Sequence, residues 1–575
     1  MKRSIKQLLT YVFIDIFVRL TFLTPSVLSI GIGIIAPFYD SYQYQDEFHL
    51  RFRANDRQFT MAAFHELAQK GYLANKLSRG FTYEDDLPSA GYYLEGLMHQ
   101  EGYDAFLTSR YDPETLQSVA ELDPMAVLVS TTMVLSVEGL IRIFSAVRKA
   151  MPGIPIIAGG VFIWKNFLSY TRYPEAESPW DQLFDSKFSF LDADILVAAP
   201  HGRRSLLQVL EEVKKGVRGS FDDIPNLVMP RNGKFFFTRR EEEIVDYNED
   251  FTRWDLVGRI VHKIPLRTSI GCPYRCVYCD FNKLHPKVFL RSPESIGREL
   301  RLAHDRFGRS PAIVHFSDDN VFINRKRVHD ICHVVTKSGF RKWMAFIRAN
   351  DYTQEEYTLM EQSGLMLAFI GVESGDQGQL DRMRKQQDVL KLKRTIENLD
   401  AHFISTFNTF IVGYPGETKE TLQNTIRFLN ELSMTHLTAS YEVFLLRIHP
   451  LTDLTEAGNR AKWGLRGFND DWSHNTMNKE EALSGLYNLF KEVRNVPYHY
   501  AEESHFFNRT KYSFEERRSF FRLRHQLTIK LIEHAPWQET ESVLKEMALS
   551  LNLPVDGLDG TMQEEIVRPL GIGGA

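Results

Sequence analysis

The distribution of apolar residues predicts two successive sets of strands and helices in this chain. In residues 1–235, short apolar runs alternate with segments of helical periodicity, which is typical of strand and helix units around a parallel sheet. A second set fills residues 263–450, and a polar, charge-rich linker at residues 236–262 separates the two. Beyond residue 450 the periodicity becomes mainly helical. We therefore expect an α/β protein with two sheet domains and a helical region at residues 451–575.

The first set predicts a Rossmann-like domain. Residues 41–87 interrupt its regular spacing and are interpreted as an insertion. A hairpin is expected in NLVMPRNGKFFFTRR, and we assign it to neither core. In doubly wound sheets, ligands bind beyond the carboxyl ends of the strands. The expected strands are SIGIGIIAPF, DAFLTSR, MAVLVSTTM, IPIIAGGVFI and ADILVAAP, and the expected helices are SAGYYLEGLMHQEG, VEGLIRIFSAVRKAMP and RRSLLQVLEEVKKG.

The second set predicts a partial parallel (β/α)6 barrel. Helical segments such as PESIGRELRLAHDRFG and TKETLQNTIRFLNEL lie between its apolar runs. In such barrels the chemistry gathers at the carboxyl ends of the strands. The expected strands are IPLRTSIG, AIVHFSDDNVF, WMAFIRAND, LMLAFIGVESG, FNTFIVGYPGET and YEVFLLRIHP.

The amino-terminal segment combines a basic start with a long apolar stretch. Asp15 and Arg19 interrupt this stretch, and Pro25 and several glycines break the remainder, whereas a spanning helix needs about 20 apolar residues in a row. We expect an amphipathic helix near residues 4–22, then a buried strand, and no membrane span. The net charge of -5 and the absence of a basic run argue against a nucleic-acid partner.

Three of the four cysteines lie within eight residues, in the stretch LRTSIGCPYRCVYCDFN. So few cysteines cannot form a disulfide framework in 575 residues, so we expect a reducing, cytoplasmic setting. Cys272, Cys276 and Cys279 follow the first expected barrel strand with the spacing C-x3-C-x2-C. Three thiolates can ligate three irons of a [4Fe–4S] cluster and leave the fourth iron open to a small molecule.

Two structural alternatives to a cluster exist for these cysteines. A structural zinc ion requires four ligands, and the next Cys or His nearby is only His285. Three unrelated core cysteines would not explain the Gly-Cys-Pro start of the loop. The fourth cysteine, Cys332, lies on an apolar helical face and is expected to be an inert core residue.

The motif CPYRCVYC resembles the signature of the radical S-adenosylmethionine (radical SAM) superfamily. The resemblance implies that the open iron chelates S-adenosylmethionine and that the reduced cluster cleaves it to a 5′-deoxyadenosyl radical. It also implies an external low-potential electron donor such as flavodoxin or ferredoxin. The protein itself would mainly bind and orient the reacting groups and would exclude side reactions.

The resemblance implies S-adenosylmethionine contacts at successive strand ends. A carboxylate suits the methionyl ammonium, and the guanidinium fork suits its carboxylate. Three of these residues have an alternative role: Asp319 as a turn cap, Arg348 in a surface ion pair and Gly413 in a turn. The implied contacts are Asp318 and Asp319 (ammonium), Arg348 (carboxylate), Glu373 (ribose), and Gly413 with Tyr278 (adenine).

A Rossmann-like domain before such a barrel resembles the cobalamin-binding class of the superfamily. The motif D-x-H-x-x-G, which supplies a histidine to cobalt in many cobalamin proteins, is absent from the sequence. His201 is a conceivable substitute, although a lone loop histidine is more often a surface or capping residue. A domain that binds no corrin is the alternative. The residues implied to contact cobalamin are Ser130, Thr131, Thr132, Gly159, Gly160, His201 and Gly202.

The resemblance favours a cobalamin-dependent methyltransferase acting on an unactivated carbon or a phosphinate phosphorus, closest to the phosphinate P-methyltransferase type. A radical rearrangement, cyclisation or epimerisation without methyl transfer is a second hypothesis, and a non-catalytic cluster- or corrin-binding sensor is a third. We expect a small-molecule substrate between the barrel mouth and the helical region, with catalytic residues unassigned. Its candidate contacts, which could equally be packing residues, are Tyr441, Arg447, His449, Trp472 and His474.

Overall fold

The structure is a computed structural model of the whole chain. Its description covers most of the two sheet domains and part of the helical region. The described residues are 31–35, 50–54, 57–59, 88–173, 183–216, 221–259, 261, 263–308, 312–436, 438–498, 514–532, 535–550 and 565–566. The helix expected near residues 4–22 and most of the insertion expected at residues 41–87 lie outside them.

The amino-terminal domain is built on one seven-stranded sheet, ordered β4-β1-β5-β6-β7-β8-β9. The first five strands in this order are parallel, and each corresponds to one of the predicted apolar runs. Their order is that of a doubly wound sheet whose strand order reverses between β1 and β5, where ligands bind in such folds. The parallel strands are β1 (Gly31–Ile35), β4 (Asp104–Thr108), β5 (Ala126–Ser130), β6 (Ile156–Gly159) and β7 (Ile195–Val197).

The hairpin β8 (Leu227–Arg231) and β9 (Lys234–Phe237) extends this sheet, so its assignment to neither core is wrong. Leu227 and Val228 pair antiparallel with Val197 and Leu196 of β7. The three residues Leu227, Val228 and Met229 are buried, which explains the pairing, because their apolar side chains are covered only when the hairpin joins the sheet.

Helices cover both faces of the first sheet. One boundary differs from the prediction: the run IPIIAGGVFI ends as a strand at Gly159 and continues as helix α7 from Val161. Gly160 makes this sharp change of direction with φ of 119°, which favours glycine. The helices of this domain are α4 (Ser89–Gln100), α5 (Pro113–Ala120), α6 (Val137–Ala150), α7 (Val161–Arg172) and α8 (Arg203–Lys214).

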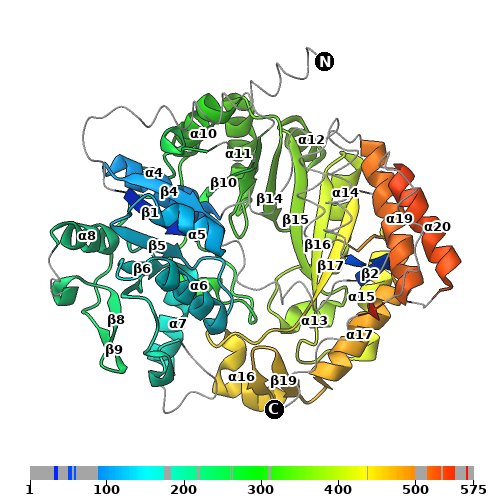
Figure 1. Cartoon of the computed structure of the whole chain (residues 1–575). Helices are drawn as coiled ribbons and strands as arrows, with labels where there is room; N and C mark the ends of the chain where they lie inside the picture. The colour runs from blue at the N-terminus through cyan, green and yellow to red at the C-terminus, as the bar shows by residue number, and fades with distance from the viewer. Residues whose placement is uncertain are drawn as a thin grey trace.

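The second domain is an open, all-parallel sheet of six strands in chain order. This confirms the predicted partial (β/α)6 barrel. Its helices lie on the convex side, and the concave side faces the amino-terminal domain (Figure 1). The strands are β10 (Lys263–Leu266), β13 (Ile313–Phe316), β14 (Trp343–Ile347), β15 (Leu365–Glu373), β16 (Ser405–Val412) and β17 (Ala439–Leu445).

The helices of the barrel begin with side-chain caps that the sequence supplies. Ser292, Asn324, Thr353, Asp388 and Thr418 each accept a hydrogen bond from a backbone N–H in the first turn of the helix that follows. These helices are α10 (Pro293–Phe307), α11 (Arg325–Ser338), α12 (Gln354–Gln362), α14 (Val389–Ala401) and α15 (Lys419–Asn430), with the short α13 (Gln377–Arg382) before α14.

The carboxy-terminal region is mainly helical, as expected, but it also contains a small antiparallel sheet. Strands β18 (Arg466–Phe468), β19 (Asp471–His474) and β20 (Met477–Asn478) form this sheet. A further sheet has the order β21-β2-β3 and joins Glu565–Ile566, Leu50–Ala54 and Arg57–Phe59. The helices are α16 (Ala457–Trp463), α17 (Lys479–Glu492), α19 (Phe514–Ile532) and α20 (Trp537–Ser550). No helix in the described ranges is long and apolar enough to cross a membrane.

Candidate active site

The three clustered cysteines lie on one loop between β11 (Ser269–Ile270) and the short helix α9 (Phe281–Leu284). Gly271 opens the loop with φ of 80°, and a side chain there would meet the carbonyl oxygen of Lys287 at 2.6 Å. Inside the loop, Val277 N–H donates to the Met383 carbonyl at 3.0 Å. These contacts fix the loop at the carboxyl end of the barrel, where the sequence predicted the site.

The three thiols are free, and burial shifts the pKa of two of them. Burial raises the pKa of the Cys279 thiol to about 12, and the nearby Asp280, Cys276 and Asp319 add to this effect. Burial also raises the pKa of Cys272, with Asp319 and Cys276 contributing. Burial therefore favours the neutral thiols of Cys272 and Cys279 until a cationic group compensates the thiolates, and the irons of a cluster supply that compensation when bound.

The ligand set suits a cluster better than a single metal ion. No three His, Cys, Asp or Glu side chains of the described residues are grouped so as to hold one metal ion. His285, the next Cys or His along the chain, lines a cavity described below. A [4Fe–4S] cluster with an open iron needs three thiolates, each on a different iron, and the loop carries three free thiols.

The two acidic residues after β13 have different environments. Asp318 is buried and accepts hydrogen bonds from the Thr268 N–H at 3.0 Å and from the Ser269 hydroxyl at 2.5 Å. Asp319 is half-buried and makes no hydrogen bond to the described residues, and burial raises its pKa to about 6 although Arg267 opposes the shift. Asp318 thus holds the base of the cysteine loop, and of the two only Asp319 is available to a ligand.

Arg348 follows β14 and lies directly against the cysteine loop. Its guanidinium carbon is 3.7 Å from the centroid of the Tyr274 ring, and it donates a hydrogen bond to the Lys385 carbonyl. Its charge also favours the thiolate of Cys272. The predicted strand-end arginine is therefore beside the cluster loop.

Glu373, Tyr278 and Lys385 form a buried polar triad. Lys385 Nζ lies 2.6 Å from Glu373 Oε1, and the Tyr278 hydroxyl donates to the same oxygen at 2.9 Å. Glu373 has φ of 67°, which is unusual for a residue other than glycine and turns its side chain at the end of β15. Burial and the Glu373 charge raise the pKa of Tyr278 well above its usual range. Lys385 was not identified from the sequence.

Gly413 occupies a position where no side chain fits. It follows β16 with φ of 91°, and an added Cβ would lie 2.4 Å from Cη2 of Trp472 and 3.0 Å from Cβ of Ala482. Its N–H donates to Glu417 Oε2 at 2.5 Å, and His474 Nε2 lies 2.9 Å from its carbonyl oxygen. The backbone at Gly413 is thus fixed from both sides.

A charged cluster joins the two domains beside the cysteine loop. Lys165 of α7 forms an ion pair with Asp280, which directly follows Cys279, and its Nζ lies 3.0 Å from His449 Nδ1. Burial and Lys165 lower the pKa of His449 to about 3, so the imidazole is neutral at physiological pH. Lys165 and Asp280 could not be identified from the sequence, because their pairing depends on how the domains pack.

The strand-end loops predicted to bind cobalamin converge around a cavity of about 190 Å³. A second cavity of about 240 Å³ shares Thr132, Gly160 and His201 with the first and adds barrel residues such as Arg267 and His285. Thr131 does not line either cavity; its hydroxyl donates to the Gly159 carbonyl at 2.9 Å. The predicted residues that line the first cavity are Ser130, Thr132, Gly159, Gly160, His201 and Gly202.

His201 is held by an acidic partner. Its Nε2 lies 2.7 Å from Asp250 Oδ2, and Asp250 also accepts hydrogen bonds from Tyr93 at 2.9 Å and Arg203 at 2.7 Å. Although burial opposes the change, these partners lower the pKa of Asp250. With its Nε2 engaged by Asp250, His201 is not positioned to offer that atom to a metal.

The five candidate substrate contacts do not form one site. Tyr441 is fully buried against Phe490 and Tyr498 on the helix-facing side of β17, so it is a packing residue. Trp472 is also a packing residue, because it is buried beneath Gly413 and donates to the Leu446 carbonyl at 2.7 Å.

The other three candidates have polar partners. His474 supports Gly413, Arg447 lies 3.6 Å from Asp470, and His449 belongs to the charged cluster with Lys165. Of the five, His449 has the most direct link to the cysteine loop, through its electrostatic interaction with Asp280.

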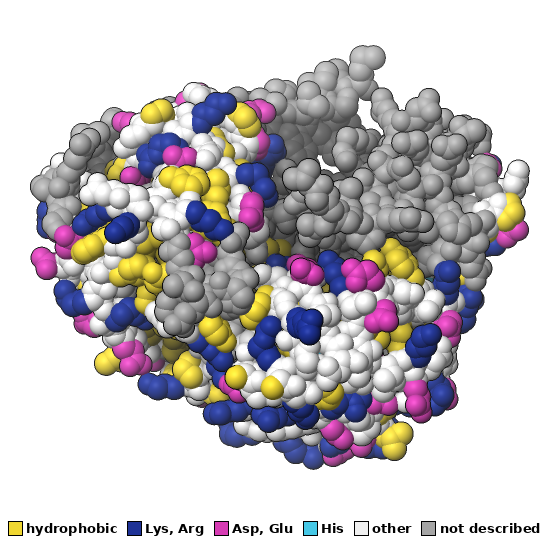
Figure 2. Space-filling model, turned by 90° about the horizontal axis from the view of Figure 1, so that it is seen from below, with side chains coloured by type: hydrophobic (Ala, Val, Ile, Leu, Met, Phe, Trp, Pro, Cys, Tyr) yellow, Lys and Arg dark blue, Asp and Glu magenta, His cyan; other side chains and the backbone are white. Residues whose placement is uncertain are grey.

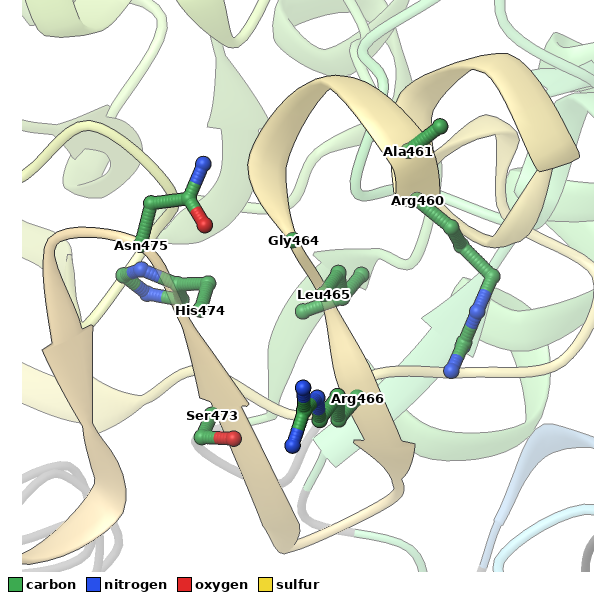
Figure 3. A pocket seen from close by; sticks show the side chains of 8 residues that line it. All are labelled: Arg460, Ala461, Gly464, Leu465, Arg466, Ser473, His474 and Asn475. Carbon is green, nitrogen blue, oxygen red and sulfur yellow. The ribbon is translucent and has the colours of Figure 1, made fainter.

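A separate hollow of about 510 Å³ lies on the carboxy-terminal region between α16 and β18–β19. Figure 3 shows Arg466 reaching from one strand toward Ser473 of the next, with His474 and Asn475 further along the segment that carries Ser473. In Figure 2, which views the molecule from below, Lys and Arg side chains are interspersed with acidic and apolar ones. Apart from His474, this hollow contains none of the predicted site residues.

Comparison with known proteins agrees with this geometry. Residues 266–429 match the model of the radical SAM superfamily. This part of the chain is a radical SAM domain. The match confirms the family resemblance of the cysteine motif, and it spans the strand-end residues from Tyr278 to Gly413.

Two curated relatives resemble parts of the chain. An uncharacterized methyltransferase of Pyrococcus horikoshii is 28% identical over 172 residues, which are 29% of this chain and 36% of the relative. The anaerobic magnesium-protoporphyrin IX monomethyl ester cyclase of Rubrivivax gelatinosus is 23% identical over 361 residues, 59% of this chain and 61% of the relative. The chain thus spans less than two thirds of the length of either relative.

A solved structure covers the radical SAM domain and the amino-terminal domain together. The cobalamin-dependent S-adenosylmethionine radical enzyme OxsB, with aqua-cobalamin and S-adenosylmethionine bound, superposes with a TM-score of 0.54 at 14% identity. The match covers 92% of this chain and 76% of OxsB. The chain therefore has the fold of OxsB, and the predicted fold class is confirmed.

Proposed function

We propose that the protein is a radical SAM enzyme that binds a [4Fe–4S] cluster through Cys272, Cys276 and Cys279. The observation that carries the proposal is the set of three free thiols on one loop at the carboxyl end of the barrel, beside Asp319 and Arg348. When bound, the cluster supplies the electron that cleaves S-adenosylmethionine. In this proposal an external low-potential carrier such as flavodoxin or ferredoxin reduces it.

The residues of the chain would bind and orient the nucleotide. Asp319 would accept from the methionyl ammonium, and the Arg348 fork would donate to the carboxylate. The half-buried Asp319, which makes no hydrogen bond or ion pair with the described residues, supports this role. Glu373 and Tyr278 would face the ribose and adenine next to Gly413, with Lys385 holding Glu373 in place at 2.6 Å. Asp318 is reassigned to support of the loop.

We further propose that the enzyme binds cobalamin and transfers a methyl group to an unactivated carbon or a phosphinate centre. Cobalamin would carry the methyl group. The cavity at the strand ends of the amino-terminal domain supports this, because its lining includes small residues and hydroxyls from three loops. The fold of OxsB and the methyltransferase relative support it as well.

A second candidate is a radical cyclisation without methyl transfer. The cyclase relative favours it, because that match covers 59% of this chain against 29% for the methyltransferase. A non-catalytic sensor is the third candidate, and the half-buried Asp319 beside the cysteine loop argues against it, because a sensor needs no group for a nucleotide ammonium.

Anaerobic reconstitution with iron and sulfide, followed by S-adenosylmethionine and a reductant, tests the enzyme proposal. We expect 5′-deoxyadenosine from the wild type and from Cys332→Ala, which removes a core cysteine outside the loop, but not from Cys276→Ala. No 5′-deoxyadenosine from the reconstituted wild type would favour the sensor.

The cobalamin proposal has its own test. Hydroxocobalamin added to the full chain should remain bound through gel filtration, with its corrin absorption retained. Thr132→Trp, which fills the cavity, should abolish retention, whereas Ser118→Trp at an exposed site on α5 should not. Equal retention by both variants would contradict binding in this cavity.

A further inference from the structure

The concave face of the barrel sheet carries its own apolar layer. Ile313, Met344, Leu367 and Phe407 form a buried cluster that is separate from the main core. Their neighbours on the same strands, such as Val314 and Ala345, belong to the main core under the helices. Because successive residues of a strand point to opposite faces, this separate cluster lies inside the barrel.

Aromatic rings continue this layer toward the carboxyl ends of the strands. The Phe346 ring stacks on the Phe369 ring with a centroid distance of 4.7 Å and an interplanar angle of 24°. Phe407 meets Phe369 edge-on at 5.5 Å, and the His315 ring lies 5.8 Å from Phe369. Phe346 remains 38% exposed although it lies inside the barrel. A flat aromatic surface is therefore accessible there.

This aromatic layer lies beneath the residues assigned to S-adenosylmethionine. Phe346 precedes Arg348, the first residue after β14, by two positions, and Phe369 precedes Glu373, the last residue of β15, by four. The alternation of faces is broken before Glu373 by a shift of register after Gly371 and by its positive φ. At about 3.3 Å per residue, the rings lie about 7 Å below Arg348 and about 13 Å below Glu373. His315 lies on β13, and Asp319 lies in the loop that follows this strand. A substrate that stacks on this layer would thus lie within reach of the nucleotide.

Phe346 and Phe369 have apolar neighbours on their own strands. Met344 precedes Phe346 and Leu367 precedes Phe369 by two residues, and both belong to the buried apolar cluster. Polar side chains lie elsewhere on the concave face, as where Lys263 of β10 pairs in register with Ile313. The two stacked rings therefore offer an apolar contact within a face that also carries polar groups.

We propose that the substrate of this enzyme carries a planar, unsaturated apolar portion that enters the barrel and stacks on Phe346 and Phe369. This inference rests on the proposed function, because it assigns the substrate class of the same site. Flat rings attract flat π systems through offset stacking and dispersion, and they offer no hydrogen bonds to a strongly polar group. A substrate portion with charged or hydroxylated groups would lose its hydration against Phe346 and Phe369 and gain no hydrogen bond from their rings.

Fluorescence titration of the full, cluster-loaded protein with 1-pyrenebutyrate tests the proposal, because the probe combines a planar apolar ring system with one polar end. We expect saturable binding that Phe346→Ala weakens about tenfold or more. Phe346→Trp, which retains a flat ring, should bind the probe like the wild type. The control Phe190→Ala removes an exposed ring, 71% accessible, outside the barrel and should leave binding unchanged.

Three results would overturn the proposal. They are the absence of saturable binding, equal binding by wild type and Phe346→Ala, and displacement of the probe by S-adenosylmethionine, which would assign the layer to the nucleotide. Circular dichroism of each variant, together with Phe369→Leu as a second variant, separates a loss of stacking from misfolding.

Measurement of 5′-deoxyadenosine on the same samples distinguishes this proposal from the proposed function. Cleavage of S-adenosylmethionine without specific probe binding contradicts only the substrate class. Specific probe binding without cleavage contradicts only the radical chemistry.

Discussion

The guanidinium of Arg348 lies over the ring of Tyr274, 3.7 Å from its centroid, and so connects the end of β14 to the loop of the cluster cysteines. A cation this close to an aromatic face is attracted by the ring quadrupole. The contact orients the guanidinium beside Cys272, whose thiolate its charge favours. One side chain thus contributes both to the loop and to the proposed nucleotide site.

Substitution of Arg348 by Lys should weaken S-adenosylmethionine binding. Lysine keeps the charge but loses the donor fork and the stacking. Hydrogen bonds to charged groups contribute about 1.5–3 kcal/mol, so we expect the Kd to rise about tenfold or more. Calorimetric titration of cluster-loaded protein measures this, with the exposed Arg341→Lys as control. An unchanged Kd for Arg348→Lys at equal iron content would disprove the assigned role.

Substitution of Gly413 by Ala should destabilise the barrel strongly. The new Cβ would combine an unfavourable positive φ with an approach to 2.4 Å from Trp472. Gly102 is a matched control, because its φ of 83° is similar but no atom lies within 4 Å of a Cβ built there.

We expect Gly102→Ala to lower the free energy of unfolding by about 1 kcal/mol and Gly413→Ala by about 2–4 kcal/mol. Urea unfolding of the two variants measures the difference. Equal losses would mean that the contact with Trp472 relaxes without cost.

The buried carboxyl of Glu417 should make stability fall as pH rises. Burial raises the pKa of this group from 4.5 to about 8, although the Gly413 N–H opposes the shift. Between these values the unfolded chain has lost the proton that the folded chain retains, so the free energy of unfolding decreases with pH, by at most about 1.4 kcal/mol per pH unit.

Glu417→Gln should remove this part of the pH dependence. Urea unfolding of both proteins between pH 5 and pH 8 provides the comparison. If the difference in stability between wild type and Glu417→Gln does not change over this range, the carboxyl is ionised in the folded state.

The ion pair of Lys385 and Glu373 should be sensitive to removal of one partner. Both side chains are buried, and loss of the lysine leaves an uncompensated carboxylate, which costs about 3–5 kcal/mol. Lys385→Met should therefore be strongly destabilising, and adding Glu373→Gln should recover much of the loss.

An exposed pair serves as the control for this double variant. Lys326 and Asp330 lie one helical turn apart on α11, with the lysine 78% exposed, so Lys326→Met should cost about 0.5 kcal/mol or less. If Lys385→Met and Lys326→Met lower the thermal unfolding temperature by similar amounts, the ion pair of Lys385 and Glu373 does not contribute as a buried pair.

The sequence was sufficient to predict both sheets because their parallel strands are buried runs separated by capped helices. The prediction failed where one apolar run continued from a strand into the next helix. At Gly160, a positive φ turns the chain from strand β6 into helix α7. It also missed the strand pairing of β8 with β7, since nothing local distinguishes a hairpin that joins a sheet from one in a linker.

The predicted site residues illustrate the same limit. The spacing of the cysteines is local and was readable, as were the strand-end positions of Arg348 and Glu373. Which of two adjacent aspartates faces the loop depends on the hydrogen bonds from Thr268 and Ser269 to Asp318. The partners Lys385 and Lys165 come from segments that only the folded chain brings together.

Electron paramagnetic resonance of the reduced, reconstituted protein tests the central claim most directly, because it reports whether an open iron binds S-adenosylmethionine. We expect a [4Fe–4S] signal in the wild type and in Cys332→Ala, and we expect this signal to change when S-adenosylmethionine is added. The triple variant, which combines Cys272→Ala, Cys276→Ala and Cys279→Ala, should give no such signal. A wild-type signal that S-adenosylmethionine leaves unchanged, or a signal that persists in the triple variant, would contradict the account.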